Sequence, residues 1–327
     1  MQFNFRTILF LGICGATVLS LLSKPADALE AATALPSQSP SPAASPATLD
    51  IPQTQLTPEA WAIEKLNASQ LPGKVLFKAD ASPEKVEQAI ALNVLGFLYQ
   101  ADYSRQDTAD ALKKCRAFLK AHQKVFRYAA KKYSIAPESI AALLWVETKF
   151  GKRTGTHSLI NVYSALLMAD HPFYIQKTLD ELIKKKPDAD YTLKKKAVDR
   201  SKSKAAWALD QFKAIGLMIQ HKNAKTRRWI LNIKASYAGA FGYPQFIPSS
   251  YVQYAVTGRG KVAVDLYRAD DAIMSVGHFL SQKGWDEDSE DSKVKALYEY
   301  NHSKDYGAII LQISGELRQK KAIHANP

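Results

Sequence analysis

The sequence predicts a mostly α-helical protein with at most a small β element. A hydroxyl residue precedes proline at Thr57-Pro58 and Ser82-Pro83, and this pair is typical of a helix start. Apolar residues then recur at the three- and four-residue spacing of an amphipathic helix. Strand-like alternation is scarce, and the best candidate for a strand is the short stretch KVAVDLY at 261–267.

Composition sets the class of protein and of partner. The chain has 327 residues, of which 46% are hydrophobic, so it can bury the core of one large domain or two small ones. Lys and Arg exceed Asp and Glu by 44 to 31, for a formal net charge of +13. This charge favours an anionic partner, which could be nucleic acid, anionic lipid or a cell-wall polymer.

The N-terminus indicates export. Arg6 precedes the apolar run ILFLGICGATVLSLL, and the small-residue pattern ADA follows at 26–28. We expect residues 1–28 to be a cleaved signal peptide that delivers the protein to the periplasm. The alternatives are a retained anchor facing the periplasm, which would be the only membrane contact, and lipidation of Cys14. Export argues against nucleic acid as a partner, and none is predicted.

A tether follows the signal segment. Residues 29–56 are rich in Pro, Ser and Ala without apolar periodicity, which is typical of a flexible linker. Cleavage near 28 would leave Cys115 as the sole cysteine, so no intramolecular disulfide is expected. Residues 57–135 are predicted to form an N-terminal helical subdomain, whose last stretch, 107–133, is long enough to be interrupted once.

A basic segment lies between 172 and 234 and includes LIKKKPDADYTLKKKAVDRSKSK. Charge runs of this kind are usually solvated helix faces. Docking onto an acidic polymer is the alternative.

The stretch ALLWVETKFG places a carboxylate among apolar residues. Pro137 and Gly151 bound a predicted helix over 137–150. On it Glu147 shares a face with Ile140, Leu143 and Leu144. Because burial of an ionised carboxylate is costly, Glu147 either pairs with a Lys or Arg or holds a raised pKa as a general acid. Spacing alone leaves both interpretations open.

An irregular segment follows at 236–255, SYAGAFGYPQFIPSSYVQYA. Its glycines and prolines argue against a plain helix. Its hydroxyl, amide and aromatic side chains together suit a sugar chain, although each by itself is better explained by turns and packing.

Four segments in order, WVETKFG, SYAGAFGYPQFIPSSYVQYAV, DDAIMSVGHFLSQKGW and YEYNHSKDYG, resemble the lytic murein transglycosylase B family. The resemblance covers roughly residues 110–310. It implies a lysozyme-like, goose-type-like catalytic domain over 136–315, with the basic segment of about 172–234 as an insertion and a C-terminal tail at 316–327.

The resemblance also implies site residues. Glu147 matches the single catalytic acid of the family. The matched sugar-binding positions are Ser236, Gln245, Phe246, Tyr300, Asn301 and, in more divergent sequence, Tyr99.

The activity implied is cleavage of the MurNAc-GlcNAc bond of peptidoglycan without water. In the family the acid protonates the bridging oxygen and then, as base, takes the proton of the muramoyl C6 hydroxyl, which leaves a 1,6-anhydro end. Peptidoglycan strands are the expected partner of a monomer without cofactor. The alternatives are a catalytically silent peptidoglycan-binding or scaffold protein and a lysozyme-type hydrolase, whose second carboxylate would come from Asp265, Asp270 or Asp271. Asp270 or Asp271 is better explained as a helix cap.

Some members of the family carry an acidic calcium loop after the Y-x-Q-Y-A segment. Here Thr257, Arg259 and Lys261 stand in that stretch. Because calcium needs several oxygen ligands, we expect no metal at this loop.

Overall fold

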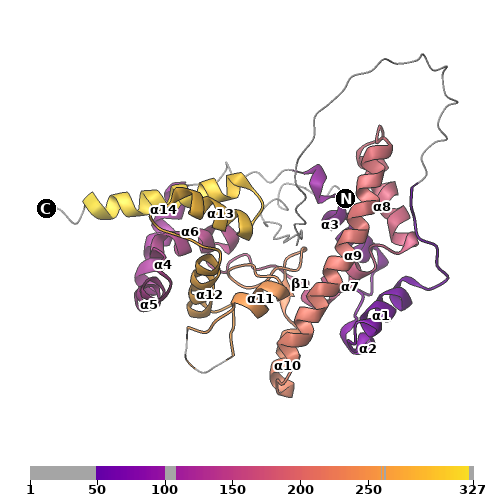
Figure 1. Cartoon of the computed structure of the whole chain (residues 1–327), viewed down its shortest axis with the longest axis horizontal. Helices are drawn as coiled ribbons and strands as arrows, with labels where there is room; N and C mark the ends of the chain where they lie inside the picture. The colour runs from indigo at the N-terminus through magenta and orange to yellow at the C-terminus, as the bar shows by residue number, and fades with distance from the viewer. Residues whose placement is uncertain (1–48, 100–107, 259, 261–262, 324–327) are drawn as a thin grey trace, which may run out of the picture.

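The computed structural model describes residues 49–99, 108–258, 260 and 263–323. Almost all regular structure in these ranges is helical (Figure 1), so the predicted mostly α-helical class is confirmed. The predicted signal peptide and most of the predicted linker lie outside the described residues. No helix in the described ranges is long and apolar enough to span a bilayer.

The helices make up most of the described chain. In chain order they are α1 Pro58–Ala68, α2 Gly73–Leu76, α3 Pro83–Val94, the 3-10 helix η2 Leu95–Leu98, α4 Thr108–Ala121, α5 Gln123–Tyr133, α6 Pro137–Thr148, α7 Leu159–Leu167, α8 Pro172–Lys185, α9 Tyr191–Ile219, α10 Ala224–Leu231, α11 Pro248–Tyr254, α12 Ala269–Gln282, α13 Glu290–Tyr300 and α14 Lys304–Ile323.

Local signals place several helix starts where the sequence predicts them. The Thr57 hydroxyl accepts a hydrogen bond from the Ala60 amide, and the Ser82 hydroxyl accepts one from Lys85. These bonds satisfy N–H groups that the first helical turn leaves without a partner. The predicted interruption of the stretch 107–133 is also present, because α4 ends and α5 begins on either side of His122.

One small sheet joins two distant segments. Strands β1, His157–Ser158, and β2, Lys234–Ala235, pair antiparallel with His157 opposite Ala235. The strand predicted at 261–267 is wrong: its described part, 263–267, contains a turn and no strand. The alternating residues there are explained by loop packing, since Leu266 is fully buried.

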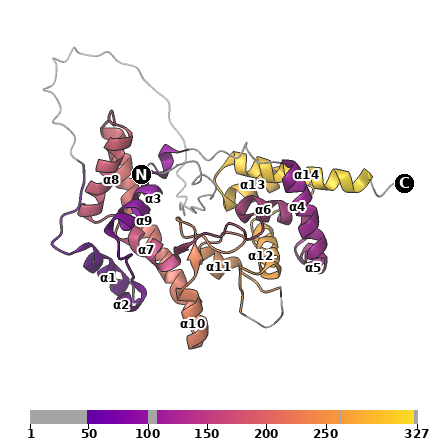
Figure 2. The same cartoon turned by 180° about the vertical axis from the view of Figure 1, so that it is seen from behind.

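The helices form two groups that lie side by side (Figures 1 and 2). One group contains α4, α5, α6, α12, α13 and α14. The other contains α1, α2, α3, α7, α8 and α9, while α11 contacts both α9 and α12. A domain boundary at 135 stays a prediction, and the helix contacts place α4 and α5 with the C-terminal helices.

The basic segment forms α8, α9 and α10, and α9 packs against α7 and α11. Charged side chains cover its outer face while Ala197, Ala208, Phe212 and Ile215 are buried. The region predicted as a tail begins inside α14, where Leu317 is buried and Arg318 pairs with Glu287 at 2.9 Å.

Candidate active site

Helix α6 carries Glu147 through the interior of the first helix group. All side chains from Glu138 to Thr148 are buried, so the helix has no solvent-facing side and the predicted single apolar stripe is too narrow. Glu147 itself is 6% exposed. The helix ends at Thr148 rather than 150, because Lys149, Phe150 and Gly151 all have positive φ, at 53°, 58° and 85°. This left-handed turn is typical of a helix C-terminus.

Glu147 is held by a hydroxyl and not by a cation. The Tyr306 hydroxyl donates a hydrogen bond to Glu147 Oε1 at 2.5 Å. No Lys, Arg or His within the described ranges forms an ion pair with this carboxyl, so the ion-pair interpretation is wrong for that part of the chain. Burial raises the pKa of Glu147 to about 8, and the Tyr306 bond opposes part of that rise.

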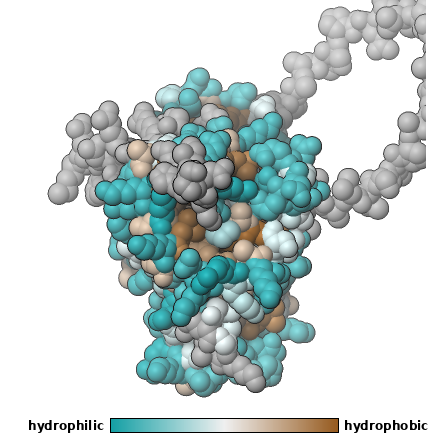
Figure 3. Space-filling model, turned by 90° about the vertical axis from the view of Figure 1, so that its left-hand side faces the viewer, coloured by the Kyte–Doolittle hydropathy of each residue, from teal (hydrophilic) through white to brown (hydrophobic). Residues whose placement is uncertain are grey.

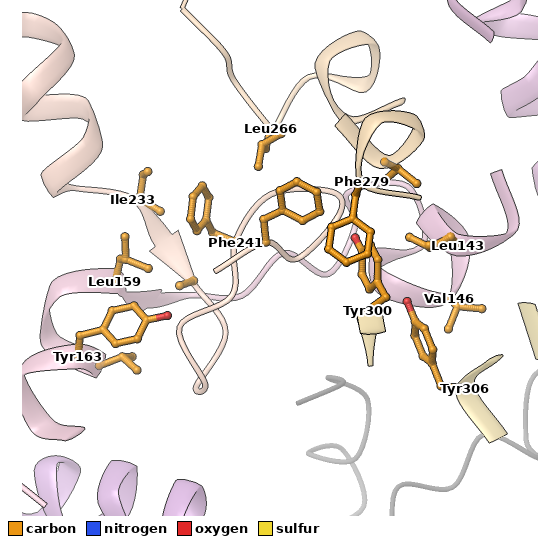
Figure 4. Packing of buried hydrophobic residues seen from close by; sticks show 14 of the residues in the cluster. Leu143, Val146, Leu159, Tyr163, Ile233, Phe241, Leu266, Phe279, Tyr300 and Tyr306 are labelled. Atoms are coloured by element: carbon orange, nitrogen blue, oxygen red, sulfur yellow. The ribbon is translucent and has the colours of Figure 1, made fainter. Parts of the chain in front are cut away.

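Tyr306 is positioned by a second tyrosine. The rings of Tyr306 and Tyr300 stack with centroids 6.2 Å apart and 17° between their planes. The Tyr300 hydroxyl donates to the Pro244 carbonyl at 2.6 Å. Figure 4 shows Tyr300 and Tyr306 side by side next to Leu143 and Val146 of α6. The segment YEYNHSKDYG thus links the carboxyl of α6 to the 236–255 loop.

The C-terminal turn of α6 contacts the same loop directly. Thr148 Oγ1 donates to the Tyr243 carbonyl at 2.9 Å and accepts from the Gly151 amide at 3.0 Å. A Cβ at Gly151 would lie 2.0 Å from the Tyr243 ring. Only glycine therefore allows this positive-φ turn and the close ring contact together. The stretch WVETKFG therefore provides both the Glu147 carboxyl and the residues that contact the loop.

Two predicted sugar-binding residues shape the loop. Ser236 Oγ accepts the Ala240 amide at 3.1 Å, which closes a tight turn. Gln245 has φ of 50°, and its Nε2 donates to the Gly242 carbonyl at 2.9 Å. Gln245 Oε1 is buried and has no hydrogen-bond partner among the described residues. An unsatisfied buried acceptor is costly, and a donor on a ligand would relieve that cost.

The other predicted positions lie in different settings. Phe246 is 2% exposed, and its ring packs 6.0 Å from the rings of both Phe279 and Tyr300. Asn301 is buried at the C-cap of α13. Tyr99 is 51% exposed and follows η2 in the other helix group.

The structure therefore connects Glu147, Tyr300, Gln245 and Phe246 through α6, α14 and the loop, whereas Tyr99 approaches from elsewhere. Sequence reasoning missed Tyr306, although it lies in a segment that carries the family resemblance. Its place in that segment, six residues after Tyr300, does not by itself indicate a contact with Glu147.

The carboxylates weighed for a second catalytic role hold other bonds. Asp271 is fully buried and accepts the amides of Gly258 at 2.9 Å and Asp265 at 2.8 Å. Asp270 lies 3.2 Å from His122 Nδ1. The predicted cap is wrong, because Arg268 occupies the N-cap of α12. Asp271 instead stabilises the loop before α12, because its carboxylate accepts amide hydrogen bonds from two positions of that loop, Gly258 and Asp265.

The sequence predicts no calcium in the loop after α11. Arg259 and Lys261 lie outside the described residues. Within the described ranges no group of three or more His, Cys, Asp and Glu side chains is placed to hold a metal ion. The absence of calcium at this loop stays a prediction.

One face of the molecule has exposed apolar character. Seen from the left-hand side of Figure 1, apolar residues gather in the middle of the face and hydrophilic residues border them (Figure 3). A surface of this kind is typical of ligand sites.

Known proteins resemble the chain in sequence and in fold. The membrane-bound lytic murein transglycosylase B of Escherichia coli (strain K12) is 26% identical over 178 residues, which are 54% of this chain and 40% of that protein. The chain thus spans about two fifths of the length of this curated relative.

Solved structures support the fold. The Escherichia coli lytic transglycosylase SLT35 in complex with bulgecin A matches with a TM-score of 0.55 and 17% identity, over 81% of this chain and 94% of that chain. SltB3 from Pseudomonas aeruginosa in complex with NAG-NAM-pentapeptide matches with a TM-score of 0.53 and 15% identity, over 80% and 78%. The predicted lysozyme-like fold class is confirmed.

A family model described as the transglycosylase SLT domain matches residues 97–293. This range includes α6, the 236–255 loop and α12, so it contains Glu147, whereas Tyr300 and Tyr306 lie beyond its C-terminal end. The chain belongs to the transglycosylase SLT domain family.

Proposed function

We propose that the protein is an exported lytic transglycosylase that cleaves peptidoglycan glycan strands, with Glu147 as its single catalytic acid and base. The observation that carries this proposal is the buried Glu147 carboxyl, whose pKa burial raises to about 8 and which accepts a hydrogen bond from the Tyr306 hydroxyl. Such a group stays protonated at neutral pH, as a general acid must. The family membership and the relatives named above support the substrate class.

In the first step the protonated Glu147 gives its proton to the oxygen between MurNAc and GlcNAc. The bond from that oxygen to the muramoyl C1 breaks, and GlcNAc leaves with a hydroxyl. Positive charge develops at C1, and the acetamido group of the substrate stabilises it. The Tyr306 hydroxyl then donates to the Glu147 carboxylate and stabilises the negative charge left there.

In the second step the Glu147 carboxylate takes the proton of the muramoyl C6 hydroxyl. The C6 oxygen bonds to C1, which yields a 1,6-anhydro end and restores the protonated acid. Protons and atoms balance without water, metal or cofactor.

The loop is proposed to hold the sugars. Gln245 Oε1 offers a buried acceptor for a hydroxyl or N–H group of the substrate. Ser236 keeps the loop closed through Ala240. Phe246, Tyr300 and Asn301 are proposed to border the bound strand and to support it, and Tyr99 to contact it from the second helix group.

The remaining predictions complete the proposal. The signal segment would deliver the protein to the periplasm, where it would act as a monomer with the domain boundaries given above. Membrane contact would arise only where that segment is retained.

Digestion of purified murein followed by mass spectrometry of the muropeptide ends tests the function. We expect 1,6-anhydro ends from the wild type and none from Glu147→Gln, because the amide cannot donate the proton. Reducing ends would support a lysozyme-type hydrolase instead. Murein binding without any product would support a silent binding protein, and unchanged activity of Glu147→Gln would refute the role of Glu147.

A further inference from the structure

Three basic side chains form a row along α9, which we call the cationic ladder: Lys196, Arg200 and Lys204. Their four-residue spacing places them on one helix face, about 6 Å apart per step and about 12 Å in total length. Lys196 Nζ lies 4.4 Å from the centroid of the Phe97 ring, and Lys204 Nζ lies 4.6 Å from that of Trp207. Cation–π contacts with Phe97 and Trp207 therefore position the two lysine side chains.

The cationic ladder has no carboxylate partner within the described ranges. Arg200 Nε donates to the Val94 carbonyl at 2.7 Å, at the C-terminal end of α3. Burial and, to a smaller extent, the neighbouring charge of Arg200 lower the pKa of Lys204 to about 8. By contrast, Lys195 and Lys213 on the same helix pair with Asp199 at 2.6 Å and Asp210 at 2.9 Å.

Like charges four residues apart destabilise a helix, and partial burial adds a desolvation cost. An anion that binds between the side chains would remove both costs. The cationic ladder is therefore better explained by a bound anion than by a solvated helix face.

The cationic ladder adjoins the 236–255 loop. The Trp207 ring lies 5.4 Å from the Tyr163 ring, and the Tyr163 hydroxyl donates to the Gly239 carbonyl at 3.0 Å. Asn93, one residue before the carbonyl that Arg200 binds, donates from Nδ2 to the Tyr237 carbonyl at 3.0 Å. Hence the cationic ladder adjoins the start of the loop, and Tyr243 of the same loop contacts α6.

We propose that the cationic ladder binds carboxylates of the peptide stems carried by the glycan strand. The proposal rests on the function proposed above and adds a specificity site to it. The sugar rings around the scissile bond are uncharged, so stem carboxylates are the anions that a strand in the loop would bring to α9. An extended peptide rises about 3.3 Å per residue, so about four stem residues would span the ladder.

The test compares two solubilised substrates and two double variants of the full protein. One substrate carries native stems, and in the other the stem carboxyls have been converted to methylamides. Lys196→Gln/Lys204→Gln removes two charges from the ladder. Lys195→Gln/Lys213→Gln removes two charges from the same helix outside the ladder and serves as the matched control.

For native stems we expect Lys196→Gln/Lys204→Gln to raise KM about tenfold, as expected for the loss of charge-assisted hydrogen bonds, with kcat unchanged. For methylamide stems its KM should equal that of the wild type. The control variant should leave both KM values within about twofold, because exposed surface charges contribute little. Thermal unfolding checks the fold, and where the double variant unfolds, Lys196→Gln alone carries the test.

Two results would overturn the inference. Equal KM increases in both double variants would show general attraction by net charge. Equal increases for both substrates would show lost packing or sugar contact. Cosedimentation of the same variants with native and methylamidated sacculi measures how binding depends on the stem carboxylates, independently of catalysis. A wild type that binds by stem charge but releases no product would refute the proposed activity and leave the ladder supported.

Discussion

Replacing Glu147 by Gln should change how the stability of the protein depends on pH. In the folded protein burial raises the pKa of Glu147 from its ordinary 4.5 to about 8. Between these values the folded chain keeps a proton that the unfolded chain releases. Stability from this group is therefore fully present below about pH 4.5, falls as the pH rises toward 8, and then levels off.

The size of the effect follows from the width of that window. Each pH unit between the two pKa values lowers the free energy of unfolding by about 1.4 kcal/mol. At about pH 7 the wild type has lost about 3 kcal/mol relative to acidic pH. The amide introduced by Glu147→Gln does not titrate, so this loss should be absent from the variant. The buried NH₂ group of that amide costs about 1–3 kcal/mol, but that cost is constant with pH.

Urea unfolding of wild type and Glu147→Gln at half-unit steps from about pH 4.5 to about pH 8.5 provides the measurement. The other titrating groups contribute equally to the free energies of unfolding of both proteins, so their contributions cancel to first order in the difference. We expect this difference to move by several kcal/mol in favour of the variant as the pH rises. A difference that stays constant across this range would refute the assignment of a buried, protonated Glu147.

Three further predictions concern Tyr306, Gly151 and the loop after α11. Tyr306→Phe removes the hydroxyl that donates to Glu147 and lowers its pKa. The alkaline limb of the pH–rate profile should therefore move up by about one pH unit, and the maximal rate should fall about tenfold. An unmoved limb would show that Tyr306 does not affect the pKa of Glu147. Gly151→Ala places a Cβ 2.0 Å from the Tyr243 ring at φ of 85°, so thermal unfolding should show a loss of about 2 kcal/mol. Gly315→Ala inside α14, where a Cβ meets no atom within 4 Å, should instead show a gain of up to about 1 kcal/mol. Calcium titration should show no saturable rise in melting temperature, and a tight, saturable rise would mean that oxygen ligands are assembled there.

Helices were predictable because their signals are local. Proline after a capping hydroxyl identifies the starts of α1 and α3, and Pro137 identifies that of α6. Glu147 was identifiable as an anomaly because a carboxylate in an apolar stretch violates the helical pattern. Its partner was not predictable from spacing, since Tyr306 lies 159 residues away. Only tertiary packing of α14 on α6 decides whether Glu147 meets a cation or a hydroxyl.

The loop residues show a second limit of sequence reasoning. Ser236 and Gln245 were expected to face a sugar, yet their side chains bond within the loop itself. A polar side chain in a Gly-rich turn serves the nearest backbone group first, because such bonds cost little entropy. Gln245 Oε1 is a buried side-chain acceptor of the described loop without a hydrogen-bond partner. The strand error near 261–267 has a similar cause, since period-two alternation also arises in loops pinned by a buried carboxylate such as Asp271.

The same group can act as acid and base only when its two protonation states are nearly balanced. Burial alone would hold Glu147 protonated and make the anion too costly for the first step to leave behind. A paired cation would do the reverse, because it would keep the carboxylate ionised before the reaction starts. The Tyr306 hydroxyl lies between these extremes, since it can accept from the protonated acid or donate to the anion. The stack of Tyr306 on Tyr300, and the bond from Tyr300 to Pro244, fix that hydroxyl through the 236–255 loop. A strand that displaces the loop would therefore shift the balance of the acid, which couples substrate binding to proton transfer.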